Sequence, residues 1–351
     1  MDDSDPATDE EPWEDEPPED DPPDSDPPEG EHVYSCAAVG DADGPDGFFT
    51  LRSFGDAVYA GEFAYGRESV SMLYRYSPWE RVSPGLTGIS ESICALIEFD
   101  GRLYANTESS GDIHRSSDGA TWEKVWDGES GTIGCGLEVF GGALYAVNYD
   151  NQDRRAGQIL KSTDGTSWSA VWHSGEGAIY LRHLVAHDGR LHALATDEDA
   201  ATGYDIWSDD GTTWTPEITP TRFFRGTSWE GALYLSSTTS NSNGPAGIWT
   251  GTNLAWSQVL EVDDAYVTEL AAWDDALWAG TSDGWKEATG ESRLLMSRDG
   301  SAWEEVCVFD EAAAWAVAPH GDHLYVGTWE YGHGGRVYEV RDTSTTHSWC
   351  R

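Results

Sequence analysis

The chain has 351 residues, with 64 Asp and Glu against 20 Lys and Arg, and a formal net charge of −44. Phosphates would repel such a polyanion, which excludes a nucleic-acid binder that works by neutralising phosphates, and docking on anionic lipid would need clusters of Lys and Arg. No run of about 18 apolar residues occurs, so membrane insertion is not expected.

The start of the chain differs from the rest in composition. Residues 1–31 contain 16 acidic residues, no basic residue and eight of the 15 prolines. Such a segment cannot bury enough apolar surface to offset its ordering entropy, and charge repulsion keeps it extended. Residues 1–32 are therefore predicted to form a disordered acidic, proline-rich tail or linker. A cation-binding or partner-binding tail is the alternative.

The tail also bears on location. Acidic residues follow Met1 at once, so no signal peptide is visible. An acidic, proline-rich segment before a globular region nevertheless resembles the spacer behind the lipid-bearing cysteine of bacterial surface lipoproteins. This resemblance implies an extracellular or cell-surface protein and allows a lipid tether through the tail, with a cytoplasmic protein as the alternative.

A repeat organises residues 33–351. The pattern S-x-D-G-x-x-W occurs at residues 116–122, 162–168, 208–214 and 297–303, and degenerate copies keep only Trp79, Trp256 and Trp349. The seven tryptophans are separated by 43, 46, 46, 42, 47 and 46 residues. Such a period is typical of an architecture in which one structural unit is repeated.

A second marker keeps the same period. It is a Leu-aromatic-Ala pattern, as in Leu103-Tyr104-Ala105, and a ring lies five residues before each aromatic position. These earlier rings are Phe54, Phe99, Phe140, His187, Trp229, Trp273 and His320. Tight Gly turns between short alternating runs indicate hairpins. We therefore predict an all-β protein, a single seven-bladed β-propeller of four-stranded antiparallel blades over residues 33–351.

The S-x-D-G-x-x-W pattern resembles the Asp-box, or BNR repeat, of sialidases, xyloglucanases, sortilin-like receptors and photosystem II assembly factors. The resemblance implies that the box aspartates bond backbone groups in a turn between the third and fourth strands, and are not catalytic. They are Asp118, Asp164, Asp210 and Asp299. The sialidase Arg-Ile-Pro motif is missing, and one propeller lacks the cleft between the two propellers of xyloglucanases.

Five cysteines leave one unpaired or more. Cys36 precedes the first blade and Cys350 is the penultimate residue, so both should lie where the ring closes, and we predict a disulfide between them. Cys94 and Cys135 occupy the same repeat position on neighbouring inner strands. We expect these strands to splay beyond the roughly 7 Å that a disulfide spans, which leaves free thiols. Cys307 is expected to fill a small space in the core.

Candidate ligand-binding residues lie on the face that carries the long, variable loops, around the mouth of the central channel. They begin the inner strands of the later blades or overhang from the last one: Arg182, His183, Phe224, Arg225, Glu269, Trp315, Trp329 and Tyr331. Cations beside aromatic rings suit a carbohydrate or a small anion. The alternative is a salt-bridged channel wall, with Arg182 or Arg225 paired to Glu269.

No cofactor and no dedicated metal site are predicted. Asp41, Asp43 and Asp46 resemble half of a calcium loop, because alternating carboxylates supply oxygen ligands, but the final Glu of an EF-hand loop is missing. A surface turn is the alternative. Ca²⁺ at these three residues is thus a weaker expectation than a simple turn.

We expect a monomeric, non-catalytic binding propeller that is secreted or tethered to the surface and offers its variable loops to a glycan or protein partner. The alternative is a glycoside hydrolase or lyase with an unrecognised site at the channel mouth, and a structural component is a third option. A mouth plugged by Phe49, Phe224 and Trp315 would favour binding or structure, whereas two convergent acids in an open cavity would favour an enzyme.

Overall fold

The computed structural model describes residues 32–44, 46–63, 72–82, 92–108, 110–128, 131–150, 157–175, 179–197, 202–238, 246–252, 255–284 and 290–344. Residues 1–31 of the predicted tail, Cys350 and the tips of the variable loops lie outside the described residues, so the disordered tail stays a prediction. Regular structure in the described ranges is entirely β. No described helix could cross a membrane.

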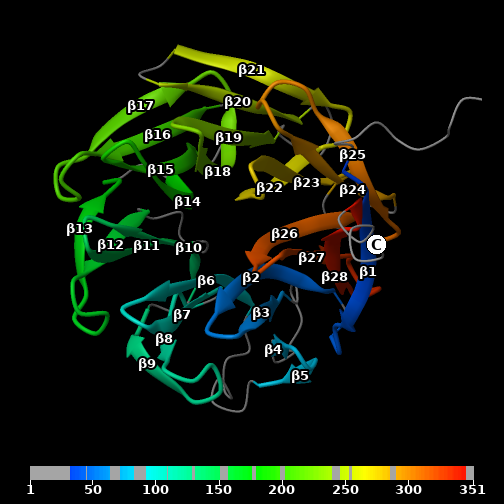
Figure 1. Ribbon diagram of the computed structural model, residues 1–351. Helices are drawn as coiled ribbons and strands as arrows, with labels where there is room; N and C mark the ends of the chain where they lie inside the picture. The colour runs from blue at the N-terminus through cyan, green and yellow to red at the C-terminus, as the bar shows by residue number, and fades with distance from the viewer. Residues whose placement is uncertain are drawn as a thin grey trace, which may run out of the picture.

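Antiparallel strands follow one another from the centre of the molecule outward (Figure 1). One four-stranded sheet contains β2 (Phe48–Phe54), β3 (Ala57–Glu62), β4 (Leu73–Tyr76) and β5 (Glu80–Arg81). The next contains β6 (Ile93–Phe99), β7 (Arg102–Thr107), β8 (Ile113–Ser116) and β9 (Trp122–Trp126). A third contains β10 (Thr132–Phe140), β11 (Ala143–Asp150), β12 (Gln158–Ser162) and β13 (Ser169–His173). A fourth contains β14 (Ile179–His187), β15 (Arg190–Asp197), β16 (Gly203–Ser208) and β17 (Thr215–Thr219).

A twelve-stranded sheet holds the other strands. Its first group is β18 (Arg222–Trp229), β19 (Ala232–Thr238), β20 (Ala246–Thr252) and β21 (Ala255–Val262). The second is β22 (Tyr266–Trp273), β23 (Ala276–Ser282), β24 (Ser292–Ser297) and β25 (Glu304–Phe309). The last is β26 (Ala313–His320), β27 (His323–Trp329), β28 (Arg336–Asp342) and β1 (Tyr34–Asp41). Single residue pairs, Thr238 with Tyr266 and Ser282 with Ala313, join the three groups.

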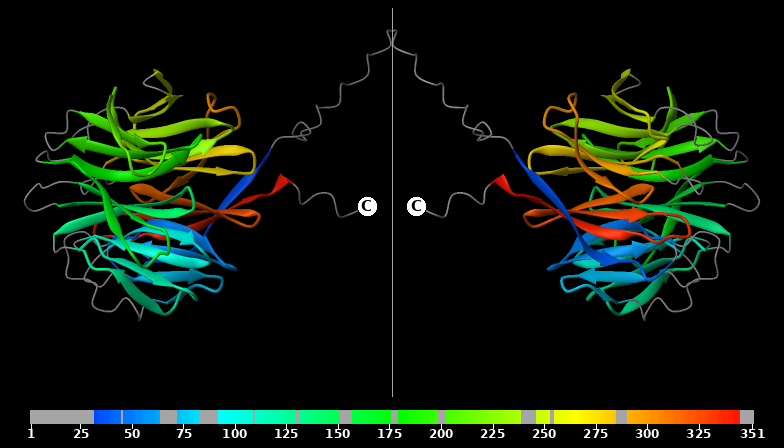
Figure 2. Two further views of the ribbon diagram at one scale, coloured as in Figure 1. Left: turned by 90° about the vertical axis from the view of Figure 1, so that its left-hand side faces the viewer. Right: turned by 90° about the vertical axis from the view of Figure 1, so that its right-hand side faces the viewer.

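The sheets surround a central axis, with the first strand of each group nearest to it (Figure 1). The N-terminal strand β1 pairs with the C-terminal strand β28, from Tyr34 opposite Asp342 to Asp41 opposite Arg336. Both strands therefore lie side by side at one place on the rim, which the side views in Figure 2 also show. The fold is all-β and propeller-like, as the repeat predicts.

Tight turns connect the first and second strands of the groups. Asp100 and Gly101 have φ values of 49° and 67°, and Asp188 and Gly189 have 43° and 76°. Two successive left-handed residues are characteristic of the two-residue hairpin turn that matches the twist of antiparallel strands, and Asp-Gly is among its favoured sequences. The turns thus form where the sequence places them.

Each box aspartate binds its own turn. Asp118 Oδ1 accepts hydrogen bonds from the backbone N–H groups of Thr121 and Ala120, at 2.7 and 2.9 Å, and from Ser116 Oγ at 2.9 Å. The two backbone bonds lower the pKa of Asp118 to about 2. The same pattern recurs at Asp164, Asp210 and Asp299. These bonds give the aspartates a structural part in the turns.

The box turns also fasten neighbouring sheets. A Cβ at Gly165 would lie 1.8 Å from the hydroxyl oxygen of Tyr104, and Gly211 has the same relation to Tyr145. Both glycines have a positive φ, near 70°. The ring of the second strand in one sheet thus reaches the box of the next sheet, where a side chain other than glycine would clash.

The first cysteine prediction is wrong. Cys36 is bonded to Cys307, with 6.5 Å between their Cα atoms, and not to Cys350. Cys36 lies on β1 and Cys307 on β25, and these two outer strands contact each other. The bridge therefore links the last two groups of the twelve-stranded sheet instead of the two chain ends, and Cys307 is more than a core filler.

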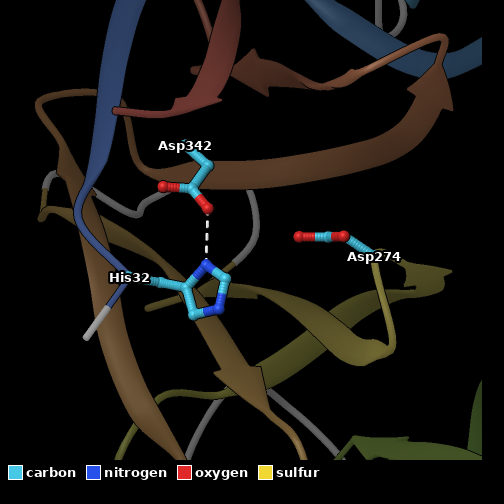
Figure 3. Close-up of side chains that lie close together, drawn as sticks. All are labelled: His32, Asp274 and Asp342. Atoms are coloured by element: carbon cyan, nitrogen blue, oxygen red, sulfur yellow. Dashed lines mark hydrogen bonds and ion pairs between the residues drawn. The ribbon is translucent and has the colours of Figure 1, made fainter. Parts of the chain in front are cut away.

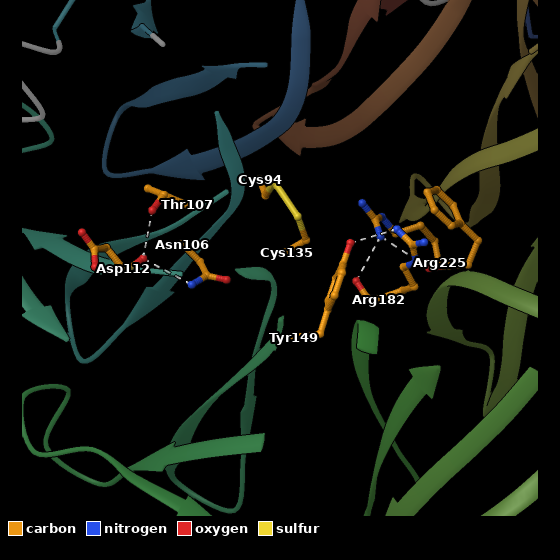
Figure 4. Close-up of a disulfide and its surroundings, with 9 residues drawn as sticks. Cys94, Asn106, Thr107, Asp112, Cys135, Tyr149, Arg182 and Arg225 are labelled. Carbon is orange, nitrogen blue, oxygen red and sulfur yellow. Dashed lines mark hydrogen bonds between the residues drawn. A yellow bond between two sulfur atoms is a disulfide. The ribbon is translucent and has the colours of Figure 1, made fainter. Parts of the chain in front are cut away.

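The expectation of free thiols at Cys94 and Cys135 is also wrong, because the structure joins them in a disulfide (Figure 4). Their Cα atoms are 4.7 Å apart, well within bridging range. The reason lies in the register: pairing shifts between Ile93 and Ala95 on β6, and between Gly134 and Gly136 on β10. Each cysteine is therefore a bulge residue, and a bulge re-aims its side chain.

Candidate functional site

Bulges at one common position converge at the mouth of the channel. In each innermost strand the pairing with the second strand shifts near the start of the strand. The residues at these shifts are Phe49, Cys94, Cys135, Arg182, Phe224, Arg225, Thr268 and Trp315. Bulges are frequent beside functional sites because they redirect side chains out of the regular ladder.

A cavity of about 290 Å³ lies at this mouth. Three arginines line it, Arg182 from β14 and Arg222 and Arg225 from β18, together with Tyr149, Tyr266 and other aromatic residues. Several lining residues lie at the ends of second strands, directly before variable loops. The cavity is therefore on the predicted face.

Arg225 is held in place by several groups. Its side chain is 6% exposed, and Nε lies 3.7 Å from Glu269 Oε2. Nη1 donates to the backbone oxygens of Arg182 and Phe224, both at 3.4 Å, and the guanidinium lies 4.6 Å from the centre of the Phe224 ring. Burial lowers the pKa of Arg225, and the charge of Glu269 opposes this effect. The Arg225–Glu269 pair is thus one contact of the predicted salt-bridged wall.

The other two arginines have no carboxylate within ion-pair distance among the described residues. Arg182 Nη1 donates to the Tyr149 hydroxyl at 3.3 Å (Figure 4). Its guanidinium lies over the rings of Tyr149 and Tyr180. Arg222 Nε is buried and has no hydrogen-bond partner among the residues that the structure describes. Burial, and then the positive charge of Arg182, lowers the pKa of Arg222.

His183 and Glu269 lie in the channel below, where a second cavity has a volume of about 570 Å³. His183 Nε2 donates to the backbone oxygen of Gly226 at 3.3 Å, and burial lowers its pKa to about 3, so the ring is neutral. Burial raises the pKa of Glu269 to about 7 against the opposing charge of Arg225. Glu138, on the same channel wall, also has its pKa raised to about 7 by burial.

Aromatic rings pack at the edge of the arginine cavity. Phe49 stacks on Trp315 with 4.5 Å between ring centres, and Phe224 meets Trp315 edge-on at 6.0 Å. Trp329 is fully buried and donates from Nε1 to the backbone oxygen of Phe63. Tyr331 packs against Trp329. The three rings expected to plug the mouth therefore belong to one buried cluster.

The predicted site residues separate into three places. Arg182, Phe224, Arg225 and Trp315 line the arginine cavity. His183 and Glu269 line the channel, which Arg225 also reaches. Trp329 belongs to the aromatic cluster and Tyr331 packs against it, and neither is among the described residues that line the arginine cavity.

Sequence reasoning missed Arg222, Tyr149 and Tyr266 as members of the site. Arg222 opens the run Arg-Phe-Phe-Arg that ends with the predicted Arg225. Tyr149 and Tyr266 each flank a loop or link on the variable face. Side chains alternate between the two faces of a strand, and the bulge between Phe223 and Gly226 shifts this alternation. Applying both to the run Arg-Phe-Phe-Arg could have predicted that Arg222 lines the same cavity.

The possible calcium turn is held by other contacts. Asp41 Oδ1 lies 3.3 Å from Arg336, and Asp43 lies 3.9 Å from Arg81. Asp46 is buried and accepts from the backbone N–H of Gly332. These contacts suit the surface-turn alternative for Asp41 and Asp43, and Ca²⁺ binding here stays a prediction.

A different group has its potential metal ligands close together. His32, Asp274 and Asp342 each offer one ligand atom within 4.8 Å of the others, and within the described ranges no other set of three such residues does (Figure 3). His32 Nδ1 and Asp342 Oδ2 are 2.5 Å apart, which accounts for one side of the cluster as an ion pair. His32 and Asp274 are exposed.

No family model and no curated protein matches this chain. Solved structures do. A streptogramin B lyase structure aligns with a TM-score of 0.66 at 12% identity, over 88% of this chain and 98% of that one. A selenomethionine-substituted virginiamycin B lyase from Staphylococcus aureus aligns with a TM-score of 0.65 at 11% identity, over 88% and 99%. At these identities the likeness shows the fold alone: the chain shares the β-propeller fold of these lyases.

Proposed function

We propose that the chain is a seven-bladed Asp-box propeller that binds an acidic glycan at its arginine cavity without transforming it. The pairing of β1 with β28 supports a ring closed by the N-terminal strand. The four box turns with the same hydrogen bonds support the Asp-box assignment. Seven blades follow when the twelve-stranded sheet is divided at its two single-pair junctions.

The observation that carries the binding proposal is the convergence of three arginines in a chain with a net charge of −44. Arg182 and Arg222 have no carboxylate partner in the described part of the chain. Burying like charges together is costly unless an anion offsets them. A carboxylate matches the fork of a guanidinium, and the neighbouring rings offer flat faces to a sugar. A uronic or sialic acid combines these two features.

The lining of the cavity supports binding rather than hydrolysis. Among its described residues Glu108 is the one carboxylate. Glycoside hydrolysis usually needs two, which flank the scissile bond. A lyase remains the alternative because both aligned structures are lyases with the same fold.

The test is titration with acidic oligosaccharides and with their methyl esters, which keep the shape and lose the charge. We expect binding of the acids and at least tenfold weaker binding of the esters. Arg222→Ala should lose tenfold or more in affinity, because a charge-assisted hydrogen bond contributes about 1.5–3 kcal/mol. Arg81→Ala, an exposed arginine away from the cavity, is the matched control.

Mass spectrometry of the same mixtures distinguishes the alternatives. Intact oligosaccharide after prolonged incubation supports a binding protein. Cleaved or unsaturated sugar products would establish a hydrolase or lyase and overturn the non-catalytic part. Equal affinity for acids and esters would refute the role of the arginines.

We also propose that the protein is exported and works at the cell surface or beyond it. Two disulfides support this, since such bonds persist in oxidising compartments. The acidic, proline-rich residues 1–31 are suited to an extended spacer. Fractionation of producing cells, with detection of the protein outside the cytoplasm, tests the location.

A further inference from the structure

A third cavity, distinct from the arginine cavity and the channel, lies at the opposite end of the sheets from the arginine cavity, between the sheet β14–β17 and the group β18–β21. Its volume is about 300 Å³. His187, His192 and Asp205 line it from the first of these sheets, and Trp256 lines it from the next group. Asp188 and Asp209, from two turns of the first sheet, place the cavity at the end that carries the tight turns and boxes.

The repeat shows that this cavity replaces packed core. His187 stands where other units have Phe54, Phe99 or Phe140. His192 stands where they have Tyr59, Tyr104, Tyr145 or Tyr234. Asp205, which pairs with Leu194, stands where they have Ile113, Ile159 or Leu294, all fully buried. Three polar residues thus occupy positions that are aromatic or aliphatic in the units compared, and His320 is the one other histidine at the position of His187.

The neighbouring unit has changed as well. In other units the tyrosine of the second strand reaches a box glycine of the next sheet, as Tyr145 reaches Gly211. The group β18–β21 has no S-x-D-G box and keeps only Trp256 of the motif. The sequence has Asn253 at the position of the box glycine. The glycine that meets the second-strand tyrosine in other units is therefore not repeated in the unit next to His192.

Asp205 has an unmatched atom in this space. The residue is 3% exposed, and its Oδ2 is bonded to His192 Nδ1 at 2.9 Å. Its Oδ1 is buried and has no hydrogen-bond partner among the described residues. A buried carboxylate oxygen without a hydrogen-bond donor is destabilising, because its desolvation is not compensated. A ligand that donates to Oδ1 would offset this cost.

The surrounding charge is negative. Asp188, Asp209 and Glu217 line the cavity together with Asp205. Arg190 is the one Arg or Lys among the lining residues. It is directed to Asp209, 2.7 Å away, and lies over the Trp207 ring at 4.2 Å. An organic cation is favoured by such a site, and a volume of about 300 Å³ is at the lower end of small-molecule pockets.

We propose that this cavity binds a small organic cation whose ammonium or guanidinium group donates to Asp205 Oδ1. The cation is either a free amine or the side chain of a basic residue in a partner protein, since both present the same chemistry. The site is independent of the arginine cavity, which would take anions.

The experiment is calorimetric titration of the full chain with agmatine and putrescine in one arm, and with short peptides containing one Lys or Arg in the other. Neutral butanol is the probe without charge. We expect saturable binding in at least one arm and none with butanol. Binding of peptides but not of free amines would identify a protein partner as the source.

Asp205→Ile restores the residue type of the equivalent positions Ile113 and Ile159. We expect this variant to bind amines at least tenfold more weakly and to melt at a higher temperature than the parent. The higher melting temperature would show that the loss of binding does not come from unfolding. Asp322→Asn removes the same charge from an exposed turn and should leave amine binding unchanged. Binding of the acidic glycan should also survive in Asp205→Ile.

Three results would overturn the proposal. They are no amine or peptide binding at millimolar concentration, unchanged amine binding in Asp205→Ile, and binding of Zn²⁺ without binding of any amine. Failure of glycan binding would affect the arginine cavity alone, because the two sites share no residue.

Discussion

Glu138 lies on the channel wall, and its ionisation should lower the free energy of unfolding as the pH rises. Its pKa is raised from 4.5 to about 7, mainly by burial, while the backbone N–H of Val139 and the charge of Arg52 oppose the shift. Between these two pH values the unfolded chain has lost the proton and the folded chain still holds it. The free energy of unfolding therefore falls across this window, by about 3 kcal/mol at about 1.4 kcal/mol per pH unit.

Glu138→Gln removes the titration and keeps an acceptor for the N–H of Val139. We expect the variant and the parent to be about equally stable at pH 4. Above pH 7 the variant should be more stable by up to about 3 kcal/mol. Urea unfolding followed by tryptophan fluorescence at several pH values measures both. The remaining acids titrate alike in the two proteins, so their effect cancels in the difference.

A difference that stays constant from pH 4 to 8.5 would refute the assignment of a raised pKa to Glu138. A difference that grows toward low pH would mean that the carboxylate is stabilised in the fold, the opposite of what its burial implies.

Three further predictions concern stability. Replacing Cys94 and Cys135 with serine should cost about 4 kcal/mol, as expected for a bridge across 41 residues, and guanidinium unfolding equal to that of the oxidised parent would contradict this. Asp118→Asn should cost about 1 kcal/mol at pH 7, and this loss should shrink as the pH falls from 3.8 toward 2. The melting temperatures of variant and parent should therefore differ at pH 7 and converge at pH 2.5; an equal difference at both pH values would contradict the lowered pKa. Gly165→Ala should cost about 2 kcal/mol, because φ is 70° and the new Cβ would meet the Tyr104 hydroxyl; an unchanged melting temperature would contradict the contact.

Much of the fold could be predicted because each repeat contains the same local sequence signals for strands and turns. The Leu103-Tyr104-Ala105 marker lies in β7, and Trp122 of the first box begins β9. Alternation fixes which residues face the core, and Asp-Gly pairs fix the turns. Such signals are local, so they can be read from the sequence.

The disulfides could not be predicted in the same way. Whether Cys94 reaches Cys135 depends on bulges in two strands. A bulge is an irregularity of strand pairing, and the repeat pattern in the sequence does not indicate it. Cys36 could be placed near the end of the chain, but its partner depends on which outer strand lies beside β1. The sequence separation of 271 residues between Cys36 and Cys307 carries no hint of that contact.

The site was predicted in part for a related reason. Aligning the repeats brought Arg182, Phe224, Arg225 and Trp315 to one end of the channel. Arg222 was missed because it lies three residues before Arg225, ahead of the bulge on β18. The register shift between Phe223 and Gly226 lets residues on both sides of the bulge line the same cavity. Aligning the repeats predicts how far along the channel a residue lies. The direction of its side chain depends on the bulge, which the alignment does not show.

The position of the Cys36–Cys307 bridge determines how the molecule would respond to pulling. A force applied at His32 enters β1 at Tyr34 and would by itself peel the strand away from β28 one residue pair after another. The bridge interrupts this after Tyr34 and Ser35, because Cys36 passes the load covalently to β25. The rest of β1, from Ala37 to Asp41, carries little of it. With the disulfide intact, separating β1 from β28 requires breaking a covalent bond. After reduction, the residue pairs between β1 and β28 can separate one after another.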